Sequence, residues 1–161
     1  MRPSAELDAL LKRSDPDSSD WADGGGHERA NELLLAFSEQ DWAALHALAP
    51  ERDARWRVCL AGALAPEQGA AARRLLLELA RAPETETAFV AAMSVAFHCG
   101  INDGAAGPFI DDGTRKPDML LDAQSTPDLT DAVRRLASAC DPRFRLRLEL
   151  LLGVLLSRPG A

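Results

Sequence analysis

The sequence predicts an all-α domain made of consecutive antiparallel helical hairpins. Leu and Ala dominate its 161 residues, Tyr is absent and Phe is scarce, so we expect an aliphatic core with few β-branched residues to favour strands. Apolar residues recur at three- and four-residue spacing, as they do on one face of a helix. Because a two-helix hairpin cannot bury both of its faces alone, we expect neighbouring hairpins to cover it in a right-handed stack of about eight helices.

The first 26 residues predict a short helix followed by a flexible linker. Residues 4–13 have the apolar spacing of a helix and begin at Ser4, a residue type that caps helix N-termini. Residues 14–26 are rich in Asp, Ser and Gly and show no periodicity. Their glycine run precedes a helix, as a phosphate-binding loop does. It lacks the GK[ST] ending and follows aspartates that would repel phosphate, so we interpret it as linker.

A single helical-repeat domain is expected over residues 27–161. Within it, residues 27–38 and a shorter helix after them predict one hairpin, and residues 56–79 predict the clearest one, with Pro66 and Glu67 at the joint. The inward positions expected in this second hairpin are Trp56, Cys59, Leu60, Ala63, Leu64, Ala72, Leu75, Leu76 and Leu79.

Proline followed by glutamate recurs between the helical segments. Proline tolerates the first turn of a helix, and a carboxylate there meets the positive end of the helix dipole, so each pair predicts a helix start. The pairs are Pro50-Glu51, Pro66-Glu67 and Pro83-Glu84. The helix after the third pair has a broad apolar surface, in which we count Phe97, and we expect this helix to be central.

The periodicity fails after Gly100, and the chain resumes it near residue 126. Glycine, proline and aspartate interrupt residues 100–118, which predicts an irregular loop. Two further helices are predicted to begin at residues 126–128 and 141–142, where a capping residue precedes proline. Apolar and charged residues alternate over 144–150 as in a strand, but the longer run also fits a helical stripe and follows Asp-Pro, so we predict a helix.

The irregular loop and its flanks carry the candidate binding residues. Their carboxylates could steer a basic partner, and a nearby apolar side chain could anchor it. A merely solvated loop is the alternative, and the spacing does not match a calcium-binding EF-hand. The candidate partner-binding residues are Asp103, Phe109, Ile110, Asp111, Asp112, Asp118 and Asp122.

Charge and cysteine usage narrow the functional class. A net charge of −7 argues against nonspecific nucleic-acid binding and fits a basic protein partner, although solubility alone is also a sufficient reason for it. Cys59, Cys99 and Cys140 are odd in number and form no CxxC pair, which favours reduced thiols in a cytosolic protein. No signal peptide is predicted, and no apolar run reaches the ~20 residues of a membrane helix, so we expect a cytoplasmic protein that does not contact membranes.

The sequence carries no recognisable catalytic or metal-binding motif. His27, His46 and His98 lack a second ligand at a persuasive helical spacing, and no nucleophile stands in a recognisable elbow. We therefore expect neither a metal nor a cofactor and predict a non-enzymatic protein. An enzyme whose site is assembled from distant residues is the alternative from another class.

Three segments in succession resemble HEAT or armadillo-type repeats: WRVCLAGAL, PEQGAAARRLLLELA and PETETAFVAAMSVAF. The resemblance covers residues 27–99 and resumes after residue 126. An acidic chain with a Trp-Arg helix before a leucine-rich one is also similar to HEAT-like bacterial immunity proteins. That resemblance implies binding and neutralisation of a cognate toxin. A general scaffold or adaptor is the alternative function. HEAT-like DNA glycosylases, which bind DNA along a basic face, are disfavoured by the acidic charge. The partner and the oligomeric state are not specified by these patterns.

Overall fold

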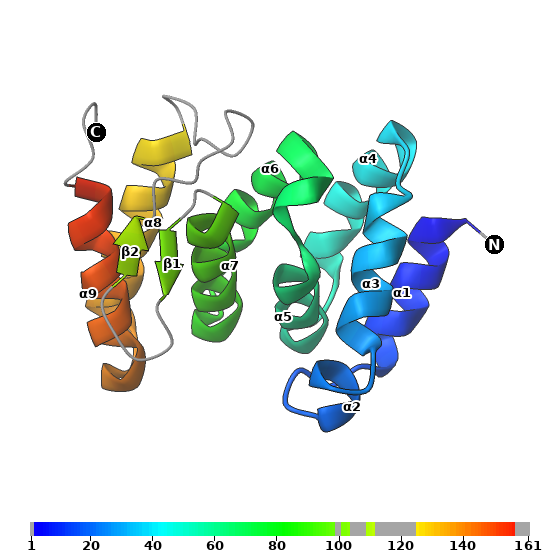
Figure 1. Ribbon diagram of the computed structural model, residues 1–161, viewed down its shortest axis with the longest axis horizontal. Helices are drawn as coiled ribbons and strands as arrows, with labels where there is room; N and C mark the ends of the chain where they lie inside the picture. Colours follow the sequence, from blue (N-terminus) through cyan, green and yellow to red (C-terminus); the bar gives the residue numbers. More distant parts are fainter. Residues whose placement is uncertain (1, 99–100, 104–108, 112–124, 157–161) are drawn as a thin grey trace.

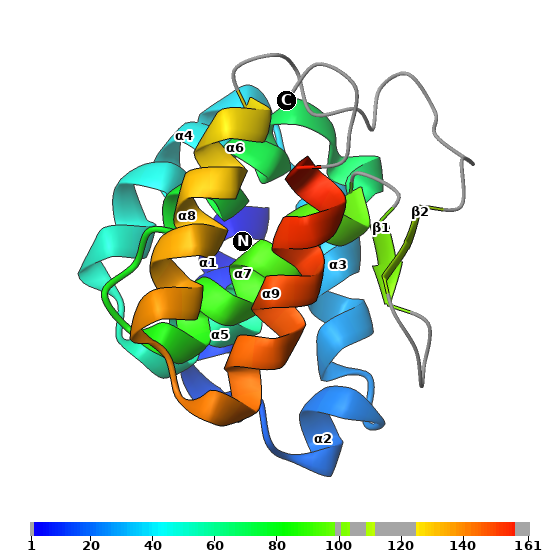
Figure 2. The same ribbon diagram turned by 90° about the vertical axis from the view of Figure 1, so that its left-hand side faces the viewer.

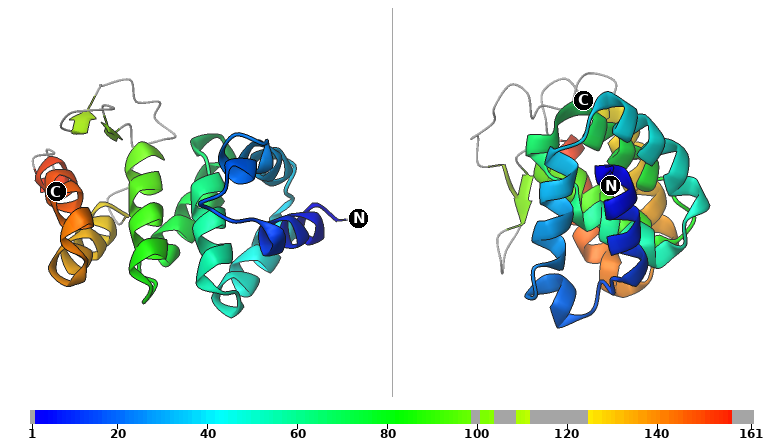
Figure 3. Two further views of the ribbon diagram at one scale, coloured as in Figure 1. Left: turned by 90° about the horizontal axis from the view of Figure 1, so that it is seen from below. Right: turned by 90° about the vertical axis from the view of Figure 1, so that its right-hand side faces the viewer.

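A computed structural model describes residues 2–98, 101–103, 109–111 and 125–156, and these residues are predominantly helical. The predicted all-α class is therefore confirmed, with one short two-stranded ladder in addition. Helices follow one another along the long axis of the molecule, with α1 (Pro3–Arg13) towards one end and α9 (Pro142–Leu156) at the other (Figures 1 and 3). Between them lie α2 (Ser19–Ala22), α3 (Gly26–Leu35), α4 (Glu39–Leu48), α5 (Ala54–Ala63), α6 (Gly69–Leu79), α7 (Thr85–His98), β1 (Ile101–Asp103), β2 (Phe109–Asp111) and α8 (Ser125–Ala139).

Contacts between helices run from one end of the molecule to the other. The helix α1 packs against α3, α3 against α5, and α5 against α7, while α6 packs against both α7 and α8. At the far end α8 packs closely against α9. The helix α7 thus contacts α5, α6 and α8, which is the central position that its apolar surface predicts.

The hydrophobic stripes read from the sequence are buried. All nine inward positions predicted for residues 56–79 belong to the core, and Trp56, the largest of these side chains, is 1% exposed. Leu7 and Leu11 of α1 are equally covered, at 0% and 1% exposure. Burying such aliphatic side chains is worth about 1.5–3 kcal/mol each before the cost of ordering the chain, so these stripes are the main stabilising term of the fold.

The first helix starts differently from the prediction. Ser4 does not cap α1, because α1 already begins at Pro3, which occupies the first turn. The Ser4 hydroxyl instead donates to Asp41 Oδ1 at 2.7 Å and so links α1 to the start of α4. Asp41 also completes a capping box with Ser38 at that helix start.

The stretch 14–26 is more structured than its composition suggests. It contains the four-residue helix α2, whose N-terminus is capped by the Ser18 hydroxyl accepting from Trp21 N. The Trp21 side chain is buried at 7% exposure, and α2 packs against α3. A single large aromatic residue therefore holds this polar segment against the helices.

The helix starts lie near the proline–glutamate pairs but not on them. Pro50 and Pro66 fall in short 3-10 turns, and the α-helices that follow begin at Ala54 and Gly69. Asp53 makes the cap of α5, because its carboxylate accepts from Trp56 N at 2.8 Å. A proline in a first turn is compatible with a 3-10 turn as well as with an α-helix, so the sequence signal alone does not separate the two.

The two C-terminal helices confirm the choice of helix over strand. α8 and α9 each span fifteen residues. In α9, Leu148, Leu151 and Leu155 are fully buried at the three- and four-residue spacing of a helix, whereas Leu146 and Leu150 are exposed. None of the described helices is long and apolar enough to cross a bilayer.

Candidate functional site

The C-terminal end of α5 is enclosed by side chains from its neighbours. The last carbonyls of an α-helix lack partners within the helix, and here four consecutive ones, from Ala61 to Leu64, accept hydrogen bonds from side chains. Ser94 Oγ donates to Ala61 O at 2.9 Å, and His27 Nε2 donates to Gly62 O at 3.0 Å. Gln68 Nε2 and Asn31 Nδ2 both donate to Ala63 O, at 3.2 and 3.4 Å. His98 Nε2 donates to Leu64 O at 3.2 Å. These bonds connect α5 to α3 and to α7.

The contacts between α5 and α7 keep a constant separation along the chain. Thr87 Oγ1 lies 3.4 Å from Ala54 O, a separation of 33 residues. The bonds from Ser94 and His98 to α5 span 33 and 34 residues. Because all three pairs advance in the same direction, α5 and α7 run parallel with a fixed register.

His98 belongs to this structural arrangement. The side chain is 1% exposed, and burial lowers the pKa of the imidazole, a shift that the hydrogen bond to Leu64 O only partly opposes. His98 Nδ1 has no hydrogen-bond partner within the described chain. The neutral form that donates from Nε2 satisfies the carbonyl without placing a charge in the core.

The three histidines do not form a metal site. His27 and His98 both bind α5 carbonyls, while His46 lies between α4 and α6. Over the residues that the structure describes, no three side chains of the metal-ligating types come together. Of the described cysteines, Cys59 and Cys140 are buried free thiols, and burial raises the pKa of Cys59 to about 11, which disfavours a thiolate nucleophile.

A groove of about 380 Å³ separates α4 from α6. The His46 side chain extends from α4 across this groove to α6, where Nδ1 lies 3.1 Å from Glu78 Oε2 and Nε2 lies 3.3 Å from the carbonyl oxygen of Ala71. The Trp42 ring on one wall is held by an edge contact with Phe37, with the ring centres 5.3 Å apart. The lining residues are Glu39, Trp42, Ala43, His46, Ala71, Arg74 and Glu78.

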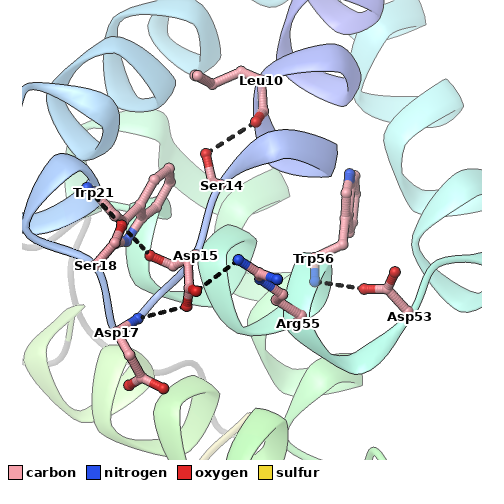
Figure 4. A network of polar contacts seen from close by, with 9 residues as sticks. All are labelled: Leu10, Ser14, Asp15, Asp17, Ser18, Trp21, Asp53, Arg55 and Trp56. Atoms are coloured by element: carbon pink, nitrogen blue, oxygen red, sulfur yellow. Dashed lines mark hydrogen bonds and ion pairs between the residues drawn. The ribbon is translucent and has the colours of Figure 1, made fainter.

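The glycine run before α3 serves a tight turn. Gly25 has φ +83°, a left-handed conformation that residues with a side chain rarely adopt, and a Cβ on Gly26 would lie 3.0 Å from the Trp21 ring. Figure 4 shows the surrounding polar contacts, in which the Asp15 carbonyl accepts from the Ser18 hydroxyl at 2.8 Å and the Asp15 carboxylate forms an ion pair with Arg55 at 2.7 Å. The adjacent cavity of about 460 Å³ is lined by acids as well as by arginines, so it has no uniformly positive surface for a phosphate.

Four of the predicted binding residues lie in the two-stranded ladder. Asp103 ends β1, and Phe109, Ile110 and Asp111 form β2. The antiparallel register pairs Asp103 with Phe109 and Ile101 with Asp111, so the backbones of the two acids stand at opposite ends of the ladder. The other three predicted residues, at positions 112, 118 and 122, lie outside the described residues.

The ladder rests on two helices. β1 contacts α7, and β2 contacts α9. Figure 2 shows the two strands at the flank of the helices. Six residues of the segment predicted to be an irregular loop therefore form a regular antiparallel ladder. Short runs of three residues carry too little alternation to be recognised as strands in a sequence.

Phe97 is a surface residue that the sequence interpretation places wrongly. Its side chain is 56% exposed, near the end of α7 and four residues before β1. At about 100° per residue, Phe97 lies on the opposite side of α7 from Ala88 and Val95, which are buried. An aromatic residue is thus exposed four residues before the strand that ends at Asp103.

The comparisons with known proteins give no relative. No family model matches the chain, and no curated protein or solved structure was found to match it.

Proposed function

We propose that this chain is a non-enzymatic protein-binding module that contacts a basic partner through the β1–β2 hairpin and the adjoining end of α7. The observation that carries the proposal is the placement of Phe97, which is 56% exposed and lies next in the chain to the hairpin bearing Asp103 and Asp111. Aromatic residues, Phe among them, are enriched in the cores of protein interfaces relative to the rest of the protein surface. The three residues are combined here in one segment of the chain, from the end of α7 to β2.

The charge of the chain supports a basic partner. The protein carries a formal charge of −7, and long-range attraction raises the rate at which an oppositely charged protein is encountered. Carboxylates on a hairpin are well suited to this steering, whereas Phe97 is suited to slowing dissociation by burying its ring.

The proposed architecture is a right-handed, HEAT-like stack of helical hairpins. The parallel α5 and α7, with their fixed separation of 33 or 34 residues, support this proposal, because a repeat stack brings equivalent helices together at a constant offset. Such stacks offer extended surfaces to other proteins. Within that class we propose an immunity protein that neutralises a cognate bacterial toxin. The free thiols of Cys59 and Cys140 support a cytoplasmic location for this protein, because thiols are kept reduced in the cytoplasm.

The first experiment tests binding and inhibition together. The protein is co-expressed with the basic toxin candidate encoded beside its gene, and growth is recorded with and without it. Rescue of growth and a stable complex of the purified pair support the immunity proposal. A complex that forms without rescue of growth would support a scaffold or adaptor in place of an immunity protein. If neither a complex nor rescue of growth is observed, the proposed function is contradicted.

The second experiment locates the surface. The double variant Asp103→Lys/Asp111→Lys should lower the association rate by tenfold or more at low salt, and the difference should shrink at high salt because ions screen the steering. Phe97→Ala should mainly raise the dissociation rate. Asp131→Lys on α8 is the control, since its side chain is 76% exposed and lies in another element. Equal kinetics for all variants would remove the hairpin from the binding surface.

A further inference from the structure

His46 links α4 to α6 across the groove between these two helices. Nδ1 of the ring lies 3.1 Å from Glu78 Oε2, and Nε2 lies 3.3 Å from the carbonyl oxygen of Ala71. The His46 side chain is 24% exposed and that of Glu78 is 56% exposed, so water reaches the carboxylate more than the ring. Each nitrogen of the imidazole therefore faces a hydrogen-bond acceptor on α6.

Only one charge state of the ring can donate to both acceptors. A carboxylate and a carbonyl oxygen accept hydrogen bonds and donate none. The neutral imidazole carries a single N–H, so its other nitrogen would direct a lone pair at one of the two oxygens. The imidazolium carries two N–H groups and donates to both. Because histidine changes charge between pH 5 and 8, the number of hydrogen bonds across the groove depends on pH in this range.

The charged groups near the ring are of both signs. Those that line the groove and the hollow of about 130 Å³ beyond it are Glu39, Arg57, Arg74, Glu78 and Arg81. Arg57 and Arg81 are each ion-paired with a carboxylate, on Glu84 and on Asp128. Among these described groups, Glu78 is the one within hydrogen-bond distance of the ring. The nearest charge therefore favours the imidazolium, and Arg74 opposes it from farther away.

The other described contacts of α4 do not change charge between pH 5 and 8. The helix packs against α1 and the turn Ala49–Glu51, and the Ser4 hydroxyl donates to Asp41 Oδ1 at 2.7 Å. Hydrogen bonds from Ser38 and Ser4 hold the pKa of Asp41 below its ordinary value of 3.8, so this carboxylate stays charged. The contact of His46 with α6 is thus the pH-dependent attachment of this helix.

We propose that His46 is a proton-controlled latch that closes α4 onto α6. The imidazolium holds Glu78 and the Ala71 carbonyl at once, and loss of its proton releases one of the two, which loosens α4 and the groove beside Trp42. The latch lies apart from the hairpin and the end of α7, so it does not depend on the proposed binding of a basic partner. Its direction is opposite to that of His98, whose burial favours the neutral ring.

Hydrogen exchange of the full-length protein at pH 5.5 and 8.0 tests the latch. After correction for the pH dependence of the chemical exchange rate, the amides of α4 should exchange about threefold faster or more at pH 8.0, relative to those of α8. His46→Gln cannot become charged, so it should behave at both pH values as the wild type does at pH 8.0. His27→Gln is the matched control, because His27 also bonds a helix carbonyl, that of Gly62, and it should keep the wild-type response of α4.

A double-mutant cycle shows whether the proton acts through Glu78. Urea unfolding at low salt compares the wild type, His46→Gln, Glu78→Gln and the double variant, and the titration of His98 cancels because all four proteins share it. The two positions should be coupled by a factor of about two or more in the unfolding equilibrium constant at pH 5.5 and by less at pH 8.0.

Three results would overturn the latch. They are an exchange rate of α4 that does not differ between the two pH values in the wild type, a pH response of α4 that remains in His46→Gln, and a coupling that is absent at pH 5.5 or equal at both pH values. Far-UV circular dichroism should show equal helix content in all variants, so that the comparison concerns folded proteins.

Discussion

Asp8 and Arg52 form a two-bond ion pair that ties α1 to the turn before α5. Arg52 donates from Nε to Oδ1 and from Nη2 to Oδ2, both at 2.8 Å, and Lys12 adds a further contact to Oδ2 at 2.8 Å. Only 17% of the Asp8 side chain is exposed. Paired donors of this kind fix orientation as well as charge, so the contact orders the first helix against the rest of the fold.

Asp8→Asn should destabilise the protein by about 2 kcal/mol at neutral pH, because Arg52 then loses a charged, two-bond partner in a partly buried place. Urea unfolding monitored by circular dichroism measures the loss. Asp17→Asn is the control, since Asp17 is exposed, and it should change the free energy of unfolding by less than ~0.5 kcal/mol. Equal losses for the two variants would show that the ion pair does not stabilise the fold.

The same pair predicts a loss of stability in acid. Burial raises the pKa of the Asp8 carboxyl, but the hydrogen bonds and positive charges of Arg52 and Lys12 outweigh burial and hold that pKa below its ordinary value of 3.8. As pH falls, Asp8 therefore binds a proton in the unfolded chain before it does so in the folded chain. Its contribution to the free energy of unfolding is complete at pH values above 3.8 and is lost as the pH falls further, through the lower pKa of the folded state. The difference between wild type and Asp8→Asn should shrink over that range in urea titrations at stepwise lower pH.

His98 predicts a second pH effect at milder acidity. Burial lowers its pKa below the ordinary 6.5, so the unfolded state binds a proton that the folded state resists, and stability should fall as pH drops below 6.5. His98→Gln keeps a donor for Leu64 O and should lack this part of the pH dependence. His98→Leu removes the donor and should cost about 1–3 kcal/mol even at pH 8. Identical pH profiles for wild type and His98→Gln would refute the assignment.

The leucine stripes could be predicted from sequence because a helical period is a local property. Trp56 and Leu60, for example, fall on one side of a helix whatever surrounds it, and both are buried. Phe97 was misplaced because a broad apolar surface hides which part of it is covered.

The enclosed end of α5 could not have been predicted. Its donors His27 and His98 lie 35 and 34 residues along the sequence from the carbonyls they bind, and no local sequence pattern predicts such distant partners. A lone histidine in a helical stripe reads equally as core, surface or ligand. Only the packing of α3 and α7 on α5 decides that the two side chains act as caps.

Gly25 and Gly62 should respond differently to replacement by alanine, because Gly25 has a left-handed backbone conformation and Gly62 has open space around it. Gly25→Ala should destabilise the protein by about 1 kcal/mol, because φ +83° before α3 is unfavourable for a residue with a Cβ. Gly62→Ala should be neutral or stabilising by up to ~1 kcal/mol, since it lies in α5 with nothing within 4 Å of the added carbon. Thermal unfolding of the two variants side by side measures the contrast, and a loss of stability at Gly62 alone would contradict it.

The central position of α7 predicts sensitivity to added volume. Ala92 is 0% exposed in this helix, which packs against α5, α6 and α8, so Ala92→Leu must displace its neighbours. We expect a loss of about 1–3 kcal/mol in the free energy of unfolding, measured with urea. The same substitution at Ala47, an exposed residue of α4, adds the same atoms without displacing packed groups and should change stability by less than ~0.5 kcal/mol. Equal stability of the two variants would mean that α7 is packed loosely enough to take three extra carbons, and its central role would then be wrong.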